Sequence, residues 1–273
     1  MAEKEIPIVY MCAGISSRFA GRIKQFAKIG PNGETLIEYS LNQALSAGFS
    51  KIIFIVGNLT EKPFRDFFGD NYKGIPVYYA LQKYDPAERD RPWGSAEALC
   101  TLKGIINRSF VICNGDDIYG EKNFKILYKH LQKSKEGVAI GYKLEESLPE
   151  KGQANRGIFE VGGLGEAKGI KETFGIEKYK LHEKGLTPNS LCSMNIFALP
   201  LETIDYLSEE FTRFKKEHEG DRKIEFLLPN EISALVKAGK LLVKIYPNKE
   251  KWIGITYPED EEIVKEYLKD KHA

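Results

Sequence analysis

The chain has 273 residues, which is enough to bury a sizeable core and to form one large domain or two small ones. Its 40 Lys and Arg balance 39 Asp and Glu, and a formal charge of +1 is too small to favour a polyanion such as duplex DNA as a partner. Four cysteines without a Cys-x-x-Cys pair, an acidic start unlike a signal peptide, and the lack of a long apolar run predict a cytoplasmic protein without a membrane partner.

The first half alternates short apolar runs with amphipathic stretches. Residues 6–12 predict a buried strand, and residues 34–46 space their apolar side chains helically. Alternation of this kind predicts a parallel sheet with helices on its faces. Further strands are expected at 51–56, 75–80 and 110–113, and further helices at 60–68 and 95–106.

The pattern changes after about residue 149, where the predicted strands become shorter and are separated by Gly-rich and charged turns. This change predicts an antiparallel insertion or lid in the second half. We find no repeat, low-complexity tract or linker that would separate domains, so we expect one domain over residues 1–273. The expected strands are 157–161, 167–171, 191–197 and 241–246, and the expected helices are 201–216, 225–238 and 260–269.

The loop after the first predicted strand combines small residues with two cations. Small side chains let backbone N–H groups approach phosphate oxygens, because no bulky group blocks them. Arg18 would add a forked donor, and Lys24, six residues later, a mobile point charge. An ordinary tight turn is the alternative for the small residues, but the two cations together favour a phosphate site. These small residues are Ala13, Gly14, Ser16 and Ser17.

Asp116 and Asp117 follow the apolar run 110–113. In open α/β sheets ligands bind at the carboxyl ends of the strands, so this pair and the loop at 14–28 should open onto one crevice. Mg²⁺ prefers oxygen ligands and needs only one or two carboxylates when phosphates supply the rest. We expect Asp116 to bind the metal, whereas for Asp117 we weigh capping of a helix beginning near Tyr119 at least as highly.

Several ordered segments carry a resemblance to a known family, and together they cover nearly the whole chain. They are 11–25, 30–40, 92–98, 114–120, 193–195, 225–229 and 252–256. They resemble sugar-1-phosphate nucleotidylyltransferases of the nucleotidyltransferase superfamily. The resemblance implies a Rossmann-related, GT-A-like α/β fold with a mixed, mainly parallel sheet flanked by helices and a small antiparallel lid or insertion. It also implies a nucleotide-binding half at 1–148 and an acceptor-binding half at 149–273.

The resemblance implies an Mg²⁺-dependent enzyme that moves a nucleoside monophosphate from an NTP to a phosphorylated small molecule and releases pyrophosphate. A sugar 1-phosphate is the favoured acceptor, and a homo-oligomer is compatible with the sequence. Carried over by position, Arg18 and Lys24 would hold the triphosphate and Asp116 would ligate Mg²⁺. The acceptor phosphate is already anionic at neutral pH, so no general base is needed.

The remaining site residues also come from the resemblance. Gln82, Gly94 and Ser95 would line the nucleotide, with Gln82 and Gly94 at the edge that reads the base. An exposed loop amide and a helix N-terminus are the plain alternatives for these positions. Gly157, Glu172 and Asn195 would contact the acceptor, against alternatives of surface strand charge and a satisfied internal amide.

One position departs from the family pattern. A second metal-binding Asp is expected two residues after Trp252, but this position is Gly254. Asp260 could serve as a substitute ligand, although a first-turn carboxylate of the last helix is the favoured interpretation.

The departure at Gly254 keeps three other functions open. They are a non-catalytic nucleotide-sensing module on the same fold, a cytidylyltransferase for an alcohol phosphate, and a GT-A glycosyltransferase. Retention of Arg18, Lys24 and Asp116 argues against the sensing module. The two cations argue against a glycosyltransferase, because its donor has no leaving pyrophosphate to hold.

Overall fold

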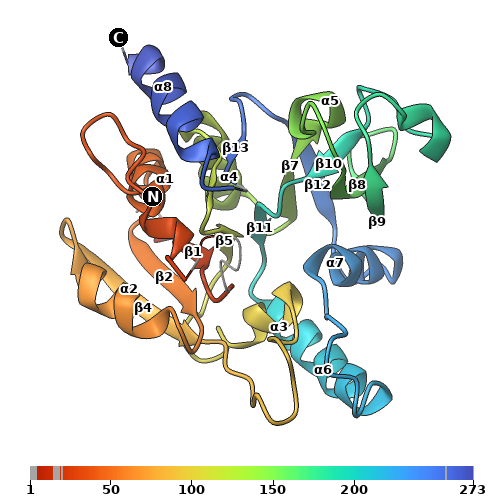
Figure 1. Ribbon diagram of the computed structural model, residues 1–273. Coiled ribbons are helices and arrows are strands. Elements are labelled where there is room, and N and C mark those ends of the chain that lie inside the picture. The colour runs from red at the N-terminus through yellow and green to blue at the C-terminus, as the bar shows by residue number, and fades with distance from the viewer. Residues whose placement is uncertain (1–4, 15–18, 20, 256, 273) are drawn as a thin grey trace.

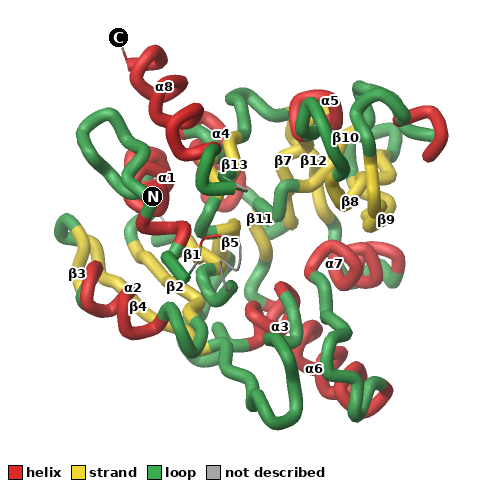
Figure 2. The backbone as a smooth tube through the Cα atoms, in the orientation of Figure 1, coloured by secondary structure: helices red, strands yellow, loops and turns green. Residues whose placement is uncertain are grey.

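The structure is a computed structural model that describes residues 5–14, 19, 21–255 and 257–272. Within these residues, eleven strands form one mixed sheet in the order β3-β4-β2-β1-β5-β11-β7-β10-β8-β9, with β12 beside β7. The strands of this sheet are β1 (Pro7–Met11), β2 (Lys51–Val56), β3 (Asn71–Tyr72), β4 (Ile75–Leu81), β5 (Phe110–Asn114), β7 (Gly137–Lys143), β8 (Ala154–Val161), β9 (Ala167–Ile176), β10 (Leu191–Ser193), β11 (Phe197–Leu199) and β12 (Val243–Pro247). Figure 2 shows them as a band running between the helices.

The helices follow the alternation that the sequence predicts. They are α1 (Leu36–Ala47), α2 (Glu61–Phe68), α3 (Ser95–Cys100), α4 (Glu121–Lys133), α5 (Leu144–Ser147), α6 (Glu202–Glu217), α7 (Leu228–Lys237) and α8 (Asp260–His272). Helix α1 begins with a capping box, in which the Thr35 side chain accepts from the Glu38 N–H and the Glu38 carboxylate accepts from the Thr35 N–H. The predicted helix at 95–106 is shorter than expected, because α3 ends at Cys100 and turns follow it.

The central strands are buried on both faces, as their uninterrupted apolar runs predict. Strand β1 lies between β2 and β5 and is parallel to both, with Tyr10 opposite Phe54 and Cys113. Ile8 and Tyr10 pack in one core cluster with α1, α2 and α4, whereas Val9 packs in another with α3, α6 and α7. Figure 1 shows α3, α6 and α7 gathered on one side of the sheet. The predicted α/β class with a mainly parallel central sheet is therefore confirmed.

The second half continues the same sheet by antiparallel pairing. Strand β11 pairs with β5, with Phe197 opposite Ile112, so the sheet passes from one half of the chain into the other. Strands β8, β9 and β10 add the predicted antiparallel region. The single strand predicted at 191–197 is wrong: β10 ends at Ser193 and β11 begins at Phe197. Asn195 lies between them at a φ of 55°, a left-handed conformation that asparagine tolerates and a strand does not use.

A small second sheet joins a late segment of the chain to the residues that follow β5. It consists of β6 (Asp117–Ile118) and β13 (Ile253–Gly254), which pair antiparallel. Helix α8 then packs Val264 and Leu268 into a third cluster with Leu36 and Ile118. Among the described helices, none has the length and apolar character needed to cross a bilayer.

Candidate active site

The centre of the site is an ion pair between the first loop and the end of β5. Lys24 opens a short 3₁₀ turn, Lys24–Phe26, and its Nζ lies 2.5 Å from Oδ2 of Asp116. The Lys24 ammonium also donates to the carbonyl of Ile255. The two side chains are 14% and 32% exposed, so the pair is partly shielded from water but remains accessible. The predicted convergence of Lys24 and Asp116 is present in the structure.

Gly115 explains why Asp116 turns toward this loop. The Gly115 N–H donates to the carbonyl of Met11 over 2.9 Å, which ties the end of β5 to the end of β1. A Cβ at Gly115 would collide with Sγ of Cys12. Because glycine has no Cβ, the chain can cross close to β1 and place Asp116 beside the first loop.

Two cavities meet at the ion pair. The larger has a volume of about 700 Å³ and the smaller about 360 Å³. Four residues line both: Lys24, Ser95, Asn114 and Asp116. The ion pair therefore lies where the contents of the two cavities would meet.

The larger cavity gathers the described residues that the resemblance assigns to the nucleotide. They are Ala13, Gly14, Gln82, Gly94 and Ser95. The other residues predicted for this role, Ser16, Ser17 and Arg18, lie outside the residues that the structure describes. Ser95 is linked to the other side of the cleft, because its Oγ accepts from the Leu228 N–H over 2.9 Å at the start of α7.

Gln82 and Gly94 are held in place by hydrogen bonds and close packing. Gln82 is only 5% exposed, so the interpretation as an exposed loop amide is wrong. Its Nε2 donates to the Gly94 carbonyl over 2.8 Å and to Oε2 of Glu97 over 2.6 Å. Gly94 has a φ of 120°, and a Cβ there would lie 2.6 Å from the carbonyl oxygen of Phe226. Gly94 therefore allows the close approach of the segment before α7.

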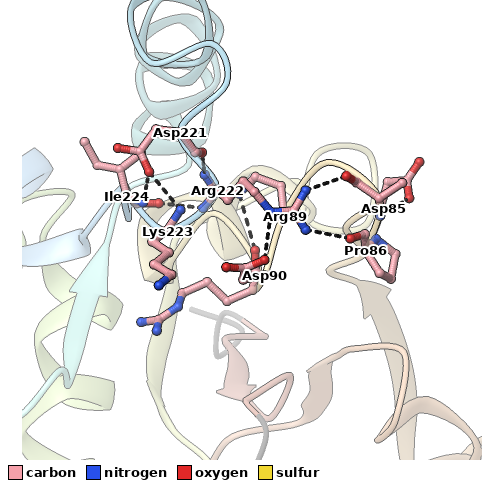
Figure 3. A network of polar contacts seen from close by, with 10 residues as sticks. Asp85, Pro86, Arg89, Asp90, Asp221, Arg222, Lys223 and Ile224 are labelled. Carbon is pink, nitrogen blue, oxygen red and sulfur yellow. Dashed lines mark hydrogen bonds and ion pairs between the residues drawn. The ribbon is translucent and has the colours of Figure 1, made fainter.

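The wall of the larger cavity is tied to the segment before α7 by contacts of one buried and one exposed arginine (Figure 3). Arg89 is 3% exposed, and its guanidinium donates to the carbonyls of Asp221 and Ile224, each over 2.5 Å. From the segment before α7, Arg222 donates back to the cavity wall, to Oδ1 of Asp90 over 2.8 Å. These contacts fix a stretch of loop that would otherwise cost entropy to order around a ligand.

The smaller cavity brings together Gly157, Glu172 and Asn195, the residues predicted to bind the acceptor. Gly157 and Glu172 face each other across β8 and β9. Burial raises the pKa of the Glu172 carboxyl, and the guanidinium of Arg156 opposes this shift. A polar cavity lined by three carboxyl groups and three asparagine amides suits a ligand rich in hydroxyl groups.

Arg156 and Trp252 also line the smaller cavity, and sequence reasoning missed both as site residues. The Arg156 guanidinium donates to the carbonyls of Ser147 and Asn155 and lies 5.5 Å from the centre of the Trp252 ring. Burial lowers the pKa of Arg156. The available signal was weak: Arg156 directly precedes the predicted Gly157, and Trp252 lay in a segment that already carried the resemblance.

Asp117 does not cap a helix, so that interpretation is wrong. It lies in β6, and the residue before α4 is Gly120, which makes no side-chain cap. Oδ2 of Asp117 accepts from Nδ2 of Asn114 over 2.8 Å and from the Tyr119 hydroxyl over 3.1 Å. Burial, and secondly the neighbouring charge of Asp116, raise the pKa of Asp117 to about 7. Asp117 thus lines the smaller cavity together with the carboxyl groups of Asp116 and Glu172.

Gly254 lies directly opposite Asp117 in the β6–β13 pair. A Cβ at position 254 would collide with the Trp252 ring and lie 2.9 Å from Oδ1 of Asp117. An aspartate at this position, as in the family pattern, would therefore clash with the side chains of Trp252 and Asp117. Glycine avoids this clash because it has no Cβ. Asp260 begins α8, and its Oδ2 accepts from the Tyr257 N–H over 2.8 Å, which fits the helix-terminus role. Its role as a metal ligand stays a prediction.

We expect Gly254→Ala to destabilise the fold by about 1–3 kcal/mol, the usual cost of inserting a methyl group into a filled site. The measurement is the free energy of unfolding from a urea titration. Gly163→Ala is the matched control, because a Cβ at Gly163 has no neighbour within 4 Å. Equal stability of the two variants would show that position 254 tolerates a side chain.

A mainly parallel central sheet flanked by helices, with the two cavities where β5 ends, is typical of a Rossmann-related, GT-A-like fold. Residues 20–255 match the family described as nucleotidyl transferase, and the chain belongs to this family. The predicted resemblance is confirmed. A comparison with curated proteins finds no match.

Solved structures share this fold over nearly the whole chain. A provisionally named glucose-1-phosphate thymidylyltransferase from Bacillus anthracis, in complex with sucrose, has a TM-score of 0.71 at 14% identity, covering 98% of this chain and 96% of that one. A UDP-glucose pyrophosphorylase complexed with UDP-glucose has a TM-score of 0.67 at 17% identity, with 98% and 100% covered. An inositol-1-phosphate CTP transferase from T. maritima has a TM-score of 0.64 at 13% identity, with 99% and 98% covered.

Proposed function

We propose that this nucleotidyl transferase moves a nucleoside monophosphate from an NTP to a phosphorylated small molecule, with a sugar 1-phosphate as the favoured acceptor, and releases pyrophosphate. The observation that carries the proposal is the position of Lys24 and Asp116 on the shared boundary of the two cavities. A transfer reaction needs its two substrates to meet at one point, and the boundary between the cavities is such a point. The names of the three similar structures all describe chemistry on phosphorylated sugars or inositol.

In this proposal the NTP occupies the larger cavity and the acceptor the smaller one. An oxygen of the acceptor phosphate attacks the α-phosphorus and forms a new P–O bond. The bond from the α-phosphorus to its bridging oxygen breaks, and the electron pair leaves with pyrophosphate. Lys24 would neutralise charge on the phosphates, and the buried walls would hold the two reactants in line.

The residues at the boundary fit a magnesium ion. Asp116 offers a partly exposed carboxylate, Asp117 a buried one beside it, and the polar cavities leave room for phosphate and water ligands. Magnesium bound there would neutralise phosphate charge and orient the oxygens around the reacting phosphorus. We propose Asp116 as its principal ligand.

The proposal is tested by mixing the protein with ATP, CTP, GTP, UTP or dTTP and a panel of sugar, inositol and other alcohol phosphates. We expect pyrophosphate release for one nucleotide and a narrow set of acceptors, and its loss on chelation with EDTA. Omission of the acceptor is the control for simple hydrolysis. Nucleotide binding without turnover across the whole panel would contradict the enzyme and favour a sensing module. Turnover with an alcohol phosphate alone would replace the sugar phosphate as the acceptor.

A further inference from the structure

We infer that Glu97 acts as a positioning residue that fixes the amide of Gln82, so that the nucleobase meets a hydrogen-bond acceptor and must offer a donor N–H group at that point. The inference rests on the proposed function, because that function places a nucleotide in the larger cavity. It adds a specificity-determining contact at Glu97, a residue that no sequence motif assigns to the site.

The orientation of the Gln82 amide follows from its partners. Nε2 lies 2.8 Å from the Gly94 carbonyl oxygen and 2.6 Å from Oε2 of Glu97. An amide nitrogen carries two hydrogens, and these two oxygens take both of them. The reversed amide would place its oxygen against a carbonyl oxygen and a carboxylate, which would repel it. Nε2 therefore points inward, and Oε1 is the group left for a ligand.

The position of Oε1 supports this conclusion. Gln82 lines the larger cavity, and its Oε1 has no hydrogen-bond partner among the residues that the structure describes. The carbonyl of Gly94 is itself fixed, because the Phe226 N–H donates to the Trp93 carbonyl over 2.5 Å and the Ala96 N–H donates to the Phe226 carbonyl over 2.9 Å. The backbone that anchors the amide thus forms part of the packed contact with the segment before α7.

Glu97 is an unusual choice for a purely structural position. It lies in α3, is 8% exposed, and has no ion pair within 4 Å among the described residues. Burial raises the pKa of its carboxyl, so the folded protein bears a cost for holding this group. An apolar side chain would fill the same space without that cost. What Glu97 adds is a second acceptor that holds the amide of Gln82.

An acceptor at this point selects among nucleobases by the donor that they present. Uracil and thymine offer N3–H, guanine N1–H and its amino group, and cytosine and adenine an exocyclic amino group. In the wild-type protein, we expect the tightest-binding of the five NTPs to lose about 10-fold in affinity when its donor is removed. The donor-lacking counterparts are purine riboside triphosphate for ATP, zebularine triphosphate for CTP, 1-methylinosine triphosphate for GTP, and the 3-methyl nucleotides for UTP and dTTP.

The test compares Glu97→Leu with Glu97→Gln by calorimetry, using the ratio of the Kd of the donor-lacking nucleotide to that of the natural one. Glu97→Gln keeps an acceptor oxygen for the Gln82 amide, so we expect the ratio to stay near 10-fold. Glu97→Leu leaves only the Gly94 carbonyl to orient the amide, so the reversed amide becomes more populated and the ratio should fall to about 3-fold. A purely structural role would change the thermal midpoint and leave the ratio unchanged.

Each result separates this inference from the proposed function. An unchanged ratio in folded Glu97→Leu, or a loss of the ratio in Glu97→Gln, would overturn the role of Glu97. If Glu97→Leu does not fold, equal affinity of the wild-type protein for natural and donor-lacking nucleotides overturns the inference without any variant. Turnover with an unchanged ratio would reject the inference alone, whereas the expected ratios without turnover would support it and reject the enzyme. Failure to bind any of the five NTPs would reject both.

Discussion

Asp116→Asn should lower turnover by about 100- to 1,000-fold, the loss expected when a group that stabilises transition-state charge is removed. The amide keeps the shape of the side chain but loses the charge that would hold Mg²⁺ at the junction of the two cavities. Asp116 is 32% exposed, so the fold should tolerate the change. The measurement is the initial rate of pyrophosphate release, together with the thermal midpoint.

Asp66→Asn is the matched control for this experiment. Asp66 is an exposed carboxylate on α2 that also forms a lysine pair, with Nζ of Lys62 at 2.5 Å, but it does not line either cavity. Its replacement should leave the rate within about twofold. Near-normal turnover of Asp116→Asn would reject Asp116 as a metal ligand.

Lys24→Ala should weaken NTP binding by about 10- to 100-fold, as expected for the loss of a charge-assisted contact to phosphate. The Lys24 ammonium lies beside Asp116, and its charge also lowers the pKa of Asp117 against the effect of burial. The variant therefore leaves two carboxyl groups without this cation at a site that must accept a polyanion. Calorimetric titration with the NTP measures the change.

Lys62→Ala provides the comparison for Lys24→Ala, since Lys62 also pairs with an aspartate but its side chain is 84% exposed. Its NTP affinity should match that of the unmodified protein. Affinity should also fall more steeply with added salt for the unmodified protein than for Lys24→Ala, because one phosphate contact is missing in the variant. If Lys24→Ala binds NTP as well as the control does, Lys24 is only a structural partner of Asp116.

The central part of the fold could be predicted because its signals are local. β1, β2 and β5 are short apolar runs, and their burial on both faces requires the parallel sheet with helices on each side. The junction of β10 and β11 could not be predicted in this way. Residues 191–197 form a nearly continuous apolar run, and only the left-handed conformation of Asn195 divides it.

The convergence of Lys24 and Asp116 was predictable, because the loop after β1 and the residues after β5 lie at the same edge of a parallel sheet. The role of a residue was not predictable where it depends on a distant partner. Asp117 became a strand residue because β13 pairs with it from the far end of the chain. The contacts of Glu97 with Gln82 and of Arg156 with Trp252 likewise join separate segments of the chain, and no local pattern encodes them.

We propose that Lys24 and Asp116 act on the polyphosphate of one bound NTP. The most direct measurement is a crystal structure of the protein with a non-hydrolysable NTP analogue and Mg²⁺. We expect the base in the larger cavity near Gln82, and the α-phosphate between Lys24 and Asp116 with its open side toward the smaller cavity. A nucleotide whose phosphates lie away from Lys24 and Asp116 would rule out this shared role of the two residues.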